Sequence, residues 1–136
     1  MPIVVDASVA AAWFFPDEDA AAAAHAARRL TDDVALVPAL FWFEIRNLLV
    51  VGERRGRVGT PETARFLADL DSLPLEVDRQ PRSADVLALA RAHALSVYDA
   101  CYLELAQRRA APLATLDRRL AGAAAVEGVT MIAGLP

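Results

Sequence analysis

Four acidic residues in this sequence stand inside apolar stretches, where a carboxylate is costly to bury. Asp6 ends the short run "PIVV" and is followed at once by "ASVAAAWFF". Asp117, in "LATLDRRL", shows the same order of apolar segment, acid and helical segment. Glu44 interrupts "FWFEIRNLLV", and Asp99 opens "DACYLELA". A buried carboxylate costs several kcal/mol unless a partner, hydrogen bonds or a cation offsets its charge. These four residues are therefore the first candidates for chemistry.

Each acid also has a structural explanation. Asp6 and Asp117 could be helix N-caps, each contributing about 1 kcal/mol to stability. Ser96 and Asp99 fit a capping box, with the acid near the positive end of a helix. Glu44 could pair with an arginine. These roles account for the acids one at a time, and they leave unexplained why four acids stand at strand ends and helix starts of a single chain.

Convergence of the four acids would demand a cation. Two carboxylates about 4 Å apart repel by roughly 4 kcal/mol at an effective dielectric constant near 20. A site of oxygen ligands without His or Cys selects a hard divalent ion. Such an ion binds phosphate oxygens and can activate a water for attack on phosphorus. The pattern therefore predicts a Mg²⁺ site, which Mn²⁺ could also occupy.

The elements that must position these acids alternate between short strands and longer helices. Strands are predicted at residues 3–5, 35–37, 75–77, 113–115 and 130–132, and helices at 8–14, 19–30, 40–54, 61–70, 83–93, 98–108 and 118–124. Thr60 is predicted as an N-cap, with Pro61 in the first helical position. This alternation is typical of an α/β domain, a three-layer α/β/α sandwich with a parallel central sheet. Ligands of such sheets bind beyond the carboxyl ends of the strands.

Length and composition favour one compact domain over residues 1–136. Hydrophobic residues make up 56% of the chain, but 30 of the 136 residues are alanine. The longest apolar stretch, 34–43, contains Pro38 and is too short to span a bilayer. With no basic-then-apolar leader at the start, the sequence predicts a cytoplasmic protein with no membrane association. A single cysteine, Cys101, excludes an internal disulfide and a cysteine-based zinc site.

The net charge of −4 and the pI of about 5.1 argue against indiscriminate nucleic-acid binding. All 14 basic residues are arginine, which fits either compositional bias or bidentate phosphate recognition. The absence of lysine disfavours phosphoaspartate chemistry, which ordinarily uses a lysine beside the phosphoryl group. No glycine-rich phosphate loop is present, and the two histidines, His25 and His93, lie in helical segments that are poorly placed for a nucleophile pair.

Together, "VVDASVAAAWFFPDE", "VPALFWFEIRNLL", "LSVYDACYLELA" and "LATLDRRL" resemble the PIN domain, most closely the small VapC toxins of bacterial toxin–antitoxin pairs. The resemblance covers nearly the whole chain, with the four acids in the expected order. It implies a metal-dependent endoribonuclease in which Asp6, Glu44, Asp99 and Asp117 are the catalytic, metal-binding acids. Ser8 and Thr115 match supporting hydroxyl positions, and Asn47 matches the polar residue one turn after the glutamate.

The resemblance also implies partners and products. The substrate would be RNA, cut to leave 5′-phosphate and 3′-hydroxyl ends. A cognate antitoxin would lie in a groove that Trp13, Phe14 and Phe15 help to line, near "FPDED" and the alanine-rich helix after it. VapC-like proteins also usually form homodimers. The alternative is a PIN-like module that binds RNA or protein without hydrolysing it.

Three arginines neighbour the acids in sequence and could reach the rim of the predicted pocket. They are Arg46, two residues after Glu44, and the pair Arg118 and Arg119, directly after Asp117. An acidic site on an acidic protein still has to attract a polyanion, so rim arginines would supply the attraction that the metal does not. The alternative is that Arg118 and Arg119 are solvated residues in the first turn of the last helix.

Overall fold

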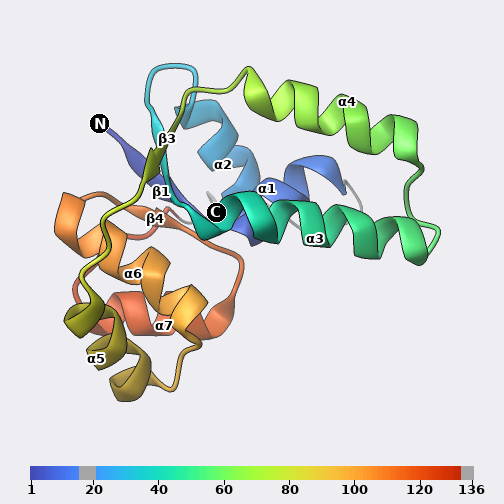
Figure 1. Cartoon of the computed structure of the whole chain (residues 1–136). Helices are drawn as coiled ribbons and strands as arrows, with labels where there is room; N and C mark the ends of the chain where they lie inside the picture. Colours follow the sequence, from blue (N-terminus) through green and yellow to red (C-terminus); the bar gives the residue numbers. More distant parts are fainter. Residues whose placement is uncertain (16–20, 133–136) are drawn as a thin grey trace.

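A four-stranded parallel sheet forms the centre of the molecule (Figure 1). The computed structural model describes residues 1–15 and 21–132. The strands are β1 (Ile3–Val5), β2 (Ala35–Pro38), β3 (Leu75–Asp78) and β4 (Leu113–Ala114), in the order β3-β2-β1-β4. In the register of the sheet, Val4 lies opposite both Leu36 and Leu113. The carboxyl ends of β1 and β4, which carry Asp6 and Asp117 after them, therefore share one edge of the sheet.

Helices cover both faces of this sheet, which confirms the predicted three-layer α/β/α architecture. The helices are α1 (Ala7–Phe14), α2 (Ala21–Arg29), α3 (Leu40–Arg54), α4 (Thr60–Asp71), α5 (Ser83–His93), α6 (Val97–Arg109) and α7 (Arg118–Val126). Val4 and Leu36 belong to a buried cluster that includes residues of α3 to α7. Ile3, Val5 and Ala35 point the other way, into a second cluster with α1 and α2. Alternation along the strands thus produces two cores.

Helices α1 and α6 place two of the candidate acids, Asp6 and Asp99, at the carboxyl edge of the sheet. Helix α1 begins directly after Asp6 and contributes to both buried clusters, because small alanine side chains allow close packing on two sides. Helix α6 is buried without interruption from Tyr102 to Ala106, so it is a central helix with little exposed face. Its first turn holds Asp99, which is therefore placed by one of the most firmly packed elements of the fold.

The structure corrects two of the predictions for these elements, the N-cap of α4 and the strand at residues 130–132. Gly59, not Thr60, is the N-cap of α4, and the Gly59 N–H donates to Glu62 Oε2 at 3.0 Å. Residues 130–132 form an isolated bridge between Leu113 and Met131 instead of a fifth strand. Helix α2 begins at Ala21, and the predicted start at residue 19 lies outside the described residues. Among the helices that the structure describes, none combines the length and apolarity needed to cross a membrane.

Candidate metal centre

Asp6 is the most firmly held of the four acids. It caps the N-terminus of α1 and is 4% exposed. Its Oδ1 accepts hydrogen bonds from the Ser8 hydroxyl at 2.6 Å and from the Val9 N–H at 3.1 Å. Its Oδ2 accepts a hydrogen bond from the Thr115 hydroxyl. These donors satisfy most of the lone pairs of the carboxylate, so its orientation is fixed before any ligand arrives.

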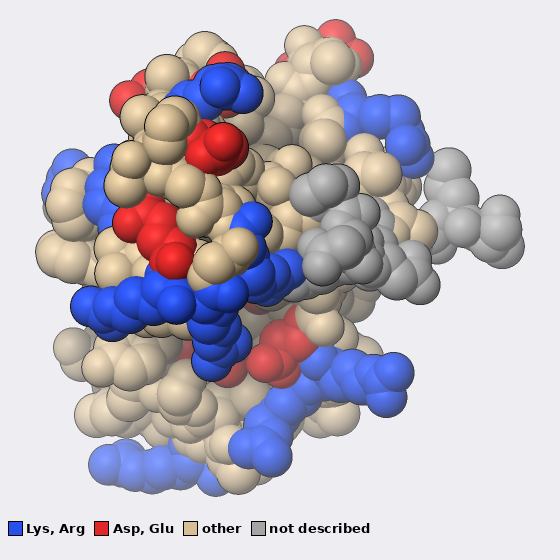
Figure 2. Space-filling model, turned by 90° about the vertical axis from the view of Figure 1, so that its right-hand side faces the viewer, with Lys and Arg blue, Asp and Glu red and all other residues tan. Residues whose placement is uncertain are grey.

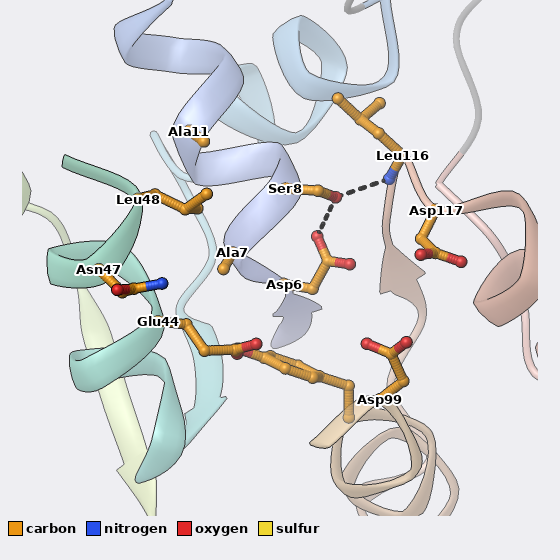
Figure 3. A pocket seen from close by; sticks show the side chains of 11 residues that line it. Asp6, Ala7, Ser8, Ala11, Glu44, Asn47, Leu48, Asp99, Leu116 and Asp117 are labelled. Carbon is orange, nitrogen blue, oxygen red and sulfur yellow. Dashed lines mark hydrogen bonds between the residues drawn. The ribbon is translucent and has the colours of Figure 1, made fainter. Parts of the chain in front are cut away.

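The two hydroxyl groups that hold Asp6 also tie down the segment after β4. Ser8 Oγ accepts a hydrogen bond from the Leu116 N–H at 2.9 Å, as Figure 3 shows. Thr115 Oγ1 accepts one from the Asp117 N–H at 3.0 Å. Each hydroxyl therefore donates to a carboxylate and accepts from the backbone. The predicted supporting residues Ser8 and Thr115 join the start of α1 to the loop that presents Asp117.

Glu44 reaches the same pocket from α3, on the other side of α1. Its Oε1 accepts a hydrogen bond from the hydroxyl of Tyr102 at 2.6 Å. The Tyr102 side chain is 1% exposed and is also part of the pocket wall. Sequence reasoning did not identify Tyr102, because a tyrosine among apolar helical residues is typical of a core. The signal that could have identified it is its position three residues after Asp99, which places both side chains on one face of a helix.

Asp99 and Asp117 stand in the first turn of α6 and at the N-cap of α7. Ser96 caps α6, and its hydroxyl accepts a hydrogen bond from the Asp99 N–H at 3.0 Å. Asp117 Oδ1 accepts one from the Leu120 N–H at 2.9 Å. The capping roles predicted for Asp6 and Asp117 are therefore confirmed. They coexist with convergence, because each cap still faces the same pocket.

The four acids line one open pocket of about 490 Å³ at the carboxyl edge of the sheet (Figure 3). Its other walls are made by Ala7, Ser8, Ala11, Asn47, Leu48, Tyr102 and Leu116. Within the part of the chain that the structure describes, no three His, Cys, Asp or Glu side chains are close enough to form a complete ligand cage. On this face of the molecule, Figure 2 shows acidic side chains in a hollow between arginine side chains.

Burial raises the pKa of three of the four acids, and repulsion between the acids adds to the rise in two of them. Burial raises the pKa of Asp6, while the hydrogen bonds from Ser8 and Thr115 oppose the rise. Burial also raises the pKa of Glu44, with the charges of Asp99 and Asp6 adding to the rise. The pKa of Asp99 is raised by burial first, then by Asp117 and Asp6. Each of these three groups thus resists ionisation in a site that lacks a cation.

The donor set fits Mg²⁺ or Mn²⁺. All the acidic groups are oxygen donors, and their repulsion would be relieved by a divalent charge. Mg²⁺ ordinarily keeps several water ligands and takes one or two carboxylates directly, so an open pocket without a preformed cage suits it. Asp6 accepts three hydrogen bonds and keeps about one lone-pair site for a cation. Glu44, Asp99 and Asp117 can supply the remaining oxygens, directly or through water.

The other residues that the sequence singled out are divided between this pocket and other surfaces. Asn47 lines the pocket beside Glu44 on α3. Arg46 does not line it. Its guanidinium lies 3.8 Å from the centroid of the Trp42 ring, and it lines a separate groove. Arg119 is close enough for its charge to lower the pKa of Asp99, and its Nη1 donates to the Ala94 carbonyl at 3.4 Å. Arg118 is exposed in the same helical turn.

Comparison with known proteins identifies the fold. The PIN domain family matches residues 3–126. Ribonuclease VapC3 of Pyrobaculum aerophilum is 36% identical over 124 residues, which are 89% of this chain and 93% of the relative. The crystal structure of PAE2754 from Pyrobaculum aerophilum has a TM-score of 0.74 at 25% identity, and covers 97% of this chain and 90% of that one. The sarcin-ricin loop cleaving toxin VapC20 of Mycobacterium tuberculosis has a TM-score of 0.61 at 17% identity, with 89% and 94% covered.

These similarities confirm the resemblance inferred from the sequence. The family match runs from β1 into α7 and so contains all four acids of the pocket. The match to VapC3 spans nearly the full length of both proteins. The chain therefore belongs to the PIN domain family, in its VapC-like ribonuclease branch.

Proposed function

We propose that this protein is a Mg²⁺- or Mn²⁺-dependent endoribonuclease, the toxin of a toxin–antitoxin pair. The observation that supports this most directly is the convergence of Asp6, Glu44, Asp99 and Asp117 on one pocket. They come from four separate segments of a PIN-family chain, and the pocket has few groups other than carboxylates with which to do chemistry. Among the described residues that line the pocket there is no His, Cys or Lys.

In this proposal the four acids bind the metal and orient the attacking water. A divalent ion at this site would supply charge for the phosphate oxygens and lower the pKa of a bound water. Asp6, held by three hydrogen bonds, and Asp99 would hold the ion directly. Glu44 and Asp117 would bind directly or through water. Attack of water on phosphorus breaks the bond to the 3′ oxygen, leaving a 5′-phosphate and a 3′-hydroxyl end.

The proposed protein partner is an antitoxin that binds beside α1. Trp13 lies at an apolar groove of about 250 Å³, together with Leu30 of the segment after α2 and Phe66 and Leu70 of α4. Trp13 Nε1 donates to the Ala23 carbonyl at 2.8 Å, which fixes the indole at this groove. Phe14 stacks on Phe66 with centroids 4.5 Å apart. The segment "PDED" that was expected beside the groove lies outside the described residues.

A homodimer is the second proposed assembly. Trp42 and Phe43, at the start of α3, are 55% and 68% exposed, and their rings are in contact. Large aromatic side chains exposed together are typical of protein interfaces. Light scattering after size-exclusion chromatography tests this assembly at micromolar concentration. A homodimer that becomes monomeric in Phe43→Glu would support it, and a wild-type monomer would refute it.

The alternative is a PIN-like module that binds RNA or protein without hydrolysis. The caps formed by Asp6 and Asp117 favour this alternative, because capping alone gives both residues a structural role. Two measurements separate the functions. The enzyme should cut single-stranded RNA in Mg²⁺ or Mn²⁺, with 5′-phosphate ends, and stop when EDTA is added. It should also melt at a higher temperature as Mn²⁺ is titrated. RNA binding with neither response would support the module and overturn the enzyme.

A further inference from the structure

Tyr102 lies in the pocket wall on α6 and donates a hydrogen bond to Glu44, an acid of another helix, α3. Its ring is enclosed in the cluster of residues between the sheet, α3 and α6. Its hydroxyl reaches Glu44 Oε1 at 2.6 Å, a short distance typical of a charged acceptor. The two residues are 58 positions apart in the chain. The contact therefore joins α3 to α6 at the floor of the pocket.

The direction of this hydrogen bond is fixed by the chemistry of its partners. An ionised carboxylate can accept but has no proton to donate, whereas a phenol can donate one. Tyr102 is therefore the donor and Glu44 the acceptor of this hydrogen bond.

The hydrogen bond divides the two oxygens of Glu44 between two tasks. Oε1 is occupied by Tyr102, and Oε2 has no hydrogen-bond partner among the residues that the structure describes. The lone pairs of Oε2 are therefore available to the pocket. Glu44 differs in this from Asp6, whose two oxygens both accept hydrogen bonds. A glutamate on an open helix face has three side-chain torsions, and without an anchor its carboxylate would sample several positions.

We propose that Tyr102 is a positioning residue of the metal centre: its hydroxyl holds Glu44 by Oε1 so that Oε2 faces the ion. This inference rests on the proposed metal-dependent function. Helix α6 then has two tasks at the site, because one face carries both Asp99 and, three residues later, the donor that orients Glu44. The separation between these two acids then depends on the packing of α3 against α6, which this hydrogen bond joins.

The test compares Tyr102→Phe with Tyr98→Phe. Both variants remove one hydroxyl from α6, but Tyr98 is 63% exposed and does not line the pocket. Loss of a group that orients a metal ligand typically weakens metal binding by about 10- to 100-fold. Thermal melting at increasing Mn²⁺ concentrations gives a Mn²⁺ midpoint, the concentration at which half of the stabilisation is reached. The Mn²⁺ midpoint of Tyr102→Phe should be higher than that of the wild type by that factor. The midpoint for Tyr98→Phe should match that of the wild type.

Cleavage kinetics separate positioning from packing. At low Mn²⁺, Tyr102→Phe should lower kcat and leave KM for a single-stranded RNA unchanged, and high Mn²⁺ should restore most of kcat. A defect in packing would not be rescued by metal. In the Glu44→Ala background, Tyr102→Phe should have no further effect on the Mn²⁺ midpoint, because the group that it orients is gone. This second comparison remains decisive if Tyr102→Phe alone is poorly folded.

The possible outcomes distinguish the positioning role from the function on which it rests. A metal-responsive, active wild type whose Mn²⁺ midpoint is within twofold of that of Tyr102→Phe would overturn the positioning role and leave the enzyme intact. The positioning role would also be overturned if Tyr102→Phe raised the Mn²⁺ midpoint equally in the wild type and in the Glu44→Ala background. A wild type that shows neither stabilisation by Mn²⁺ nor cleavage would overturn the proposed function itself.

Discussion

The Thr115 hydroxyl donates a hydrogen bond to Asp6 Oδ2 across 109 residues of chain. The two residues follow β4 and β1, which are neighbouring parallel strands, so their side chains meet at the carboxyl edge of the sheet. The same hydroxyl accepts a hydrogen bond from the Asp117 N–H. One threonine thus orients two of the four acids, Asp6 through its carboxylate and Asp117 through its backbone.

Thr115→Val should therefore destabilise the protein and disturb the site. Valine has nearly the shape of threonine but leaves the buried Asp6 oxygen without this donor, and the partly buried Asp117 N–H without this acceptor. Leaving a buried polar group unsatisfied costs about 1–3 kcal/mol. Urea denaturation should show a loss of that size in the free energy of unfolding, and Mn²⁺ should stabilise the variant less than the wild type.

Thr63→Val is the matched control for this loss. Thr63 Oγ1 is buried in α4 and has no hydrogen-bond partner among the described residues. Replacing it by a methyl group removes an unsatisfied polar atom, so the free energy of unfolding should stay the same or rise. Equal losses from both substitutions would show that the hydroxyl of Thr115 does not stabilise the fold through Asp6.

The positions of the acids could be predicted because each is specified locally. Asp6 and Asp117 follow apolar strands, and a parallel sheet brings such positions to one edge. Glu44 and Asp99 interrupt apolar helical patterns, which identifies them as facing protein. The fold class follows from the same alternation of strands and helices. Residues 130–132 are predicted as a strand, but within the described part of the chain they form a single bridge, between Met131 and Leu113.

The side of α3 on which Arg46 lies and the contact between Tyr102 and Glu44 could not be predicted from distance along the sequence. Arg46 is two residues from Glu44, but two residues are about 200° of rotation around a helix, so it lies over Trp42 on another side of α3. Tyr102 is 58 residues from Glu44, and their contact depends on how α3 packs against α6. A tyrosine with an apolar ring and a polar tip fits a core equally well. Tertiary packing decides both cases.

Asp99→Asn should stabilise the metal-free protein at neutral pH. Burial and the charges of Asp117 and Asp6 raise the pKa of Asp99 above its ordinary value of 3.8. The folded state then binds the proton more tightly than the unfolded chain, so the free energy of unfolding falls as the pH rises through this interval. Above the interval the penalty is complete, and Asn removes it. In EDTA, the variant should melt a few degrees above the wild type at pH 7.

The higher melting temperature of Asp99→Asn should be lost at low pH and reversed in Mn²⁺. Well below pH 3.8 the Asp99 carboxyl is protonated in both the folded and the unfolded state, so the two proteins should melt alike. In saturating Mn²⁺ the order should reverse, because the wild type gains a ligand–metal interaction that Asn provides poorly. Asp32→Asn, at an exposed loop position, is the control and should change little. A metal-free Asp99→Asn that melts below the wild type at pH 7 would contradict the repulsion between the acids.

A second buried charge cluster lies outside the pocket. We expect it to contribute to the free energy of unfolding and to leave metal binding unchanged. Arg108 donates to Asp78 Oδ2 and to Glu104 Oε1, both at 2.6 Å, and Glu104 is 2% exposed. Arg108→Met leaves this buried carboxylate without its cation, which typically costs about 3–5 kcal/mol. Arg108 also lowers the pKa of Asp78, so the loss should be largest at neutral pH and shrink as the pH falls.

Urea denaturation of Arg108→Met and Arg109→Met provides the comparison. Arg109 is 3.8 Å from Glu76, and both partners are exposed, so its loss should cost less than about 1 kcal/mol. The Mn²⁺ midpoint should be unchanged in both variants, since neither arginine lines the acidic pocket. A shifted midpoint in Arg108→Met would mean that the cluster also positions the metal centre through α6.

Arg118 and Arg119 provide the test of how an acidic pocket attracts RNA. Both stand in the first turn of α7, near its positive end, where a cation is slightly unfavourable. Arg119 is close enough to the pocket for its charge to lower the pKa of Asp99. If both contact phosphates, their replacement by alanine should reduce the slope of log K against log[salt] by about one unit per lost contact. Binding of a single-stranded RNA would be measured in the Asp99→Asn background, so that cleavage does not interfere.

The same double variant should leave metal binding intact or improve it, because it removes positive charge from beside the acids. Arg65→Ala with Arg91→Ala changes the net charge equally at exposed positions of α4 and α5, away from the pocket. This control separates a general loss of positive charge from a local one: it should weaken RNA binding little and leave the salt slope unchanged. If Arg118 and Arg119 are only solvated, their replacement will give the same salt slope as the control.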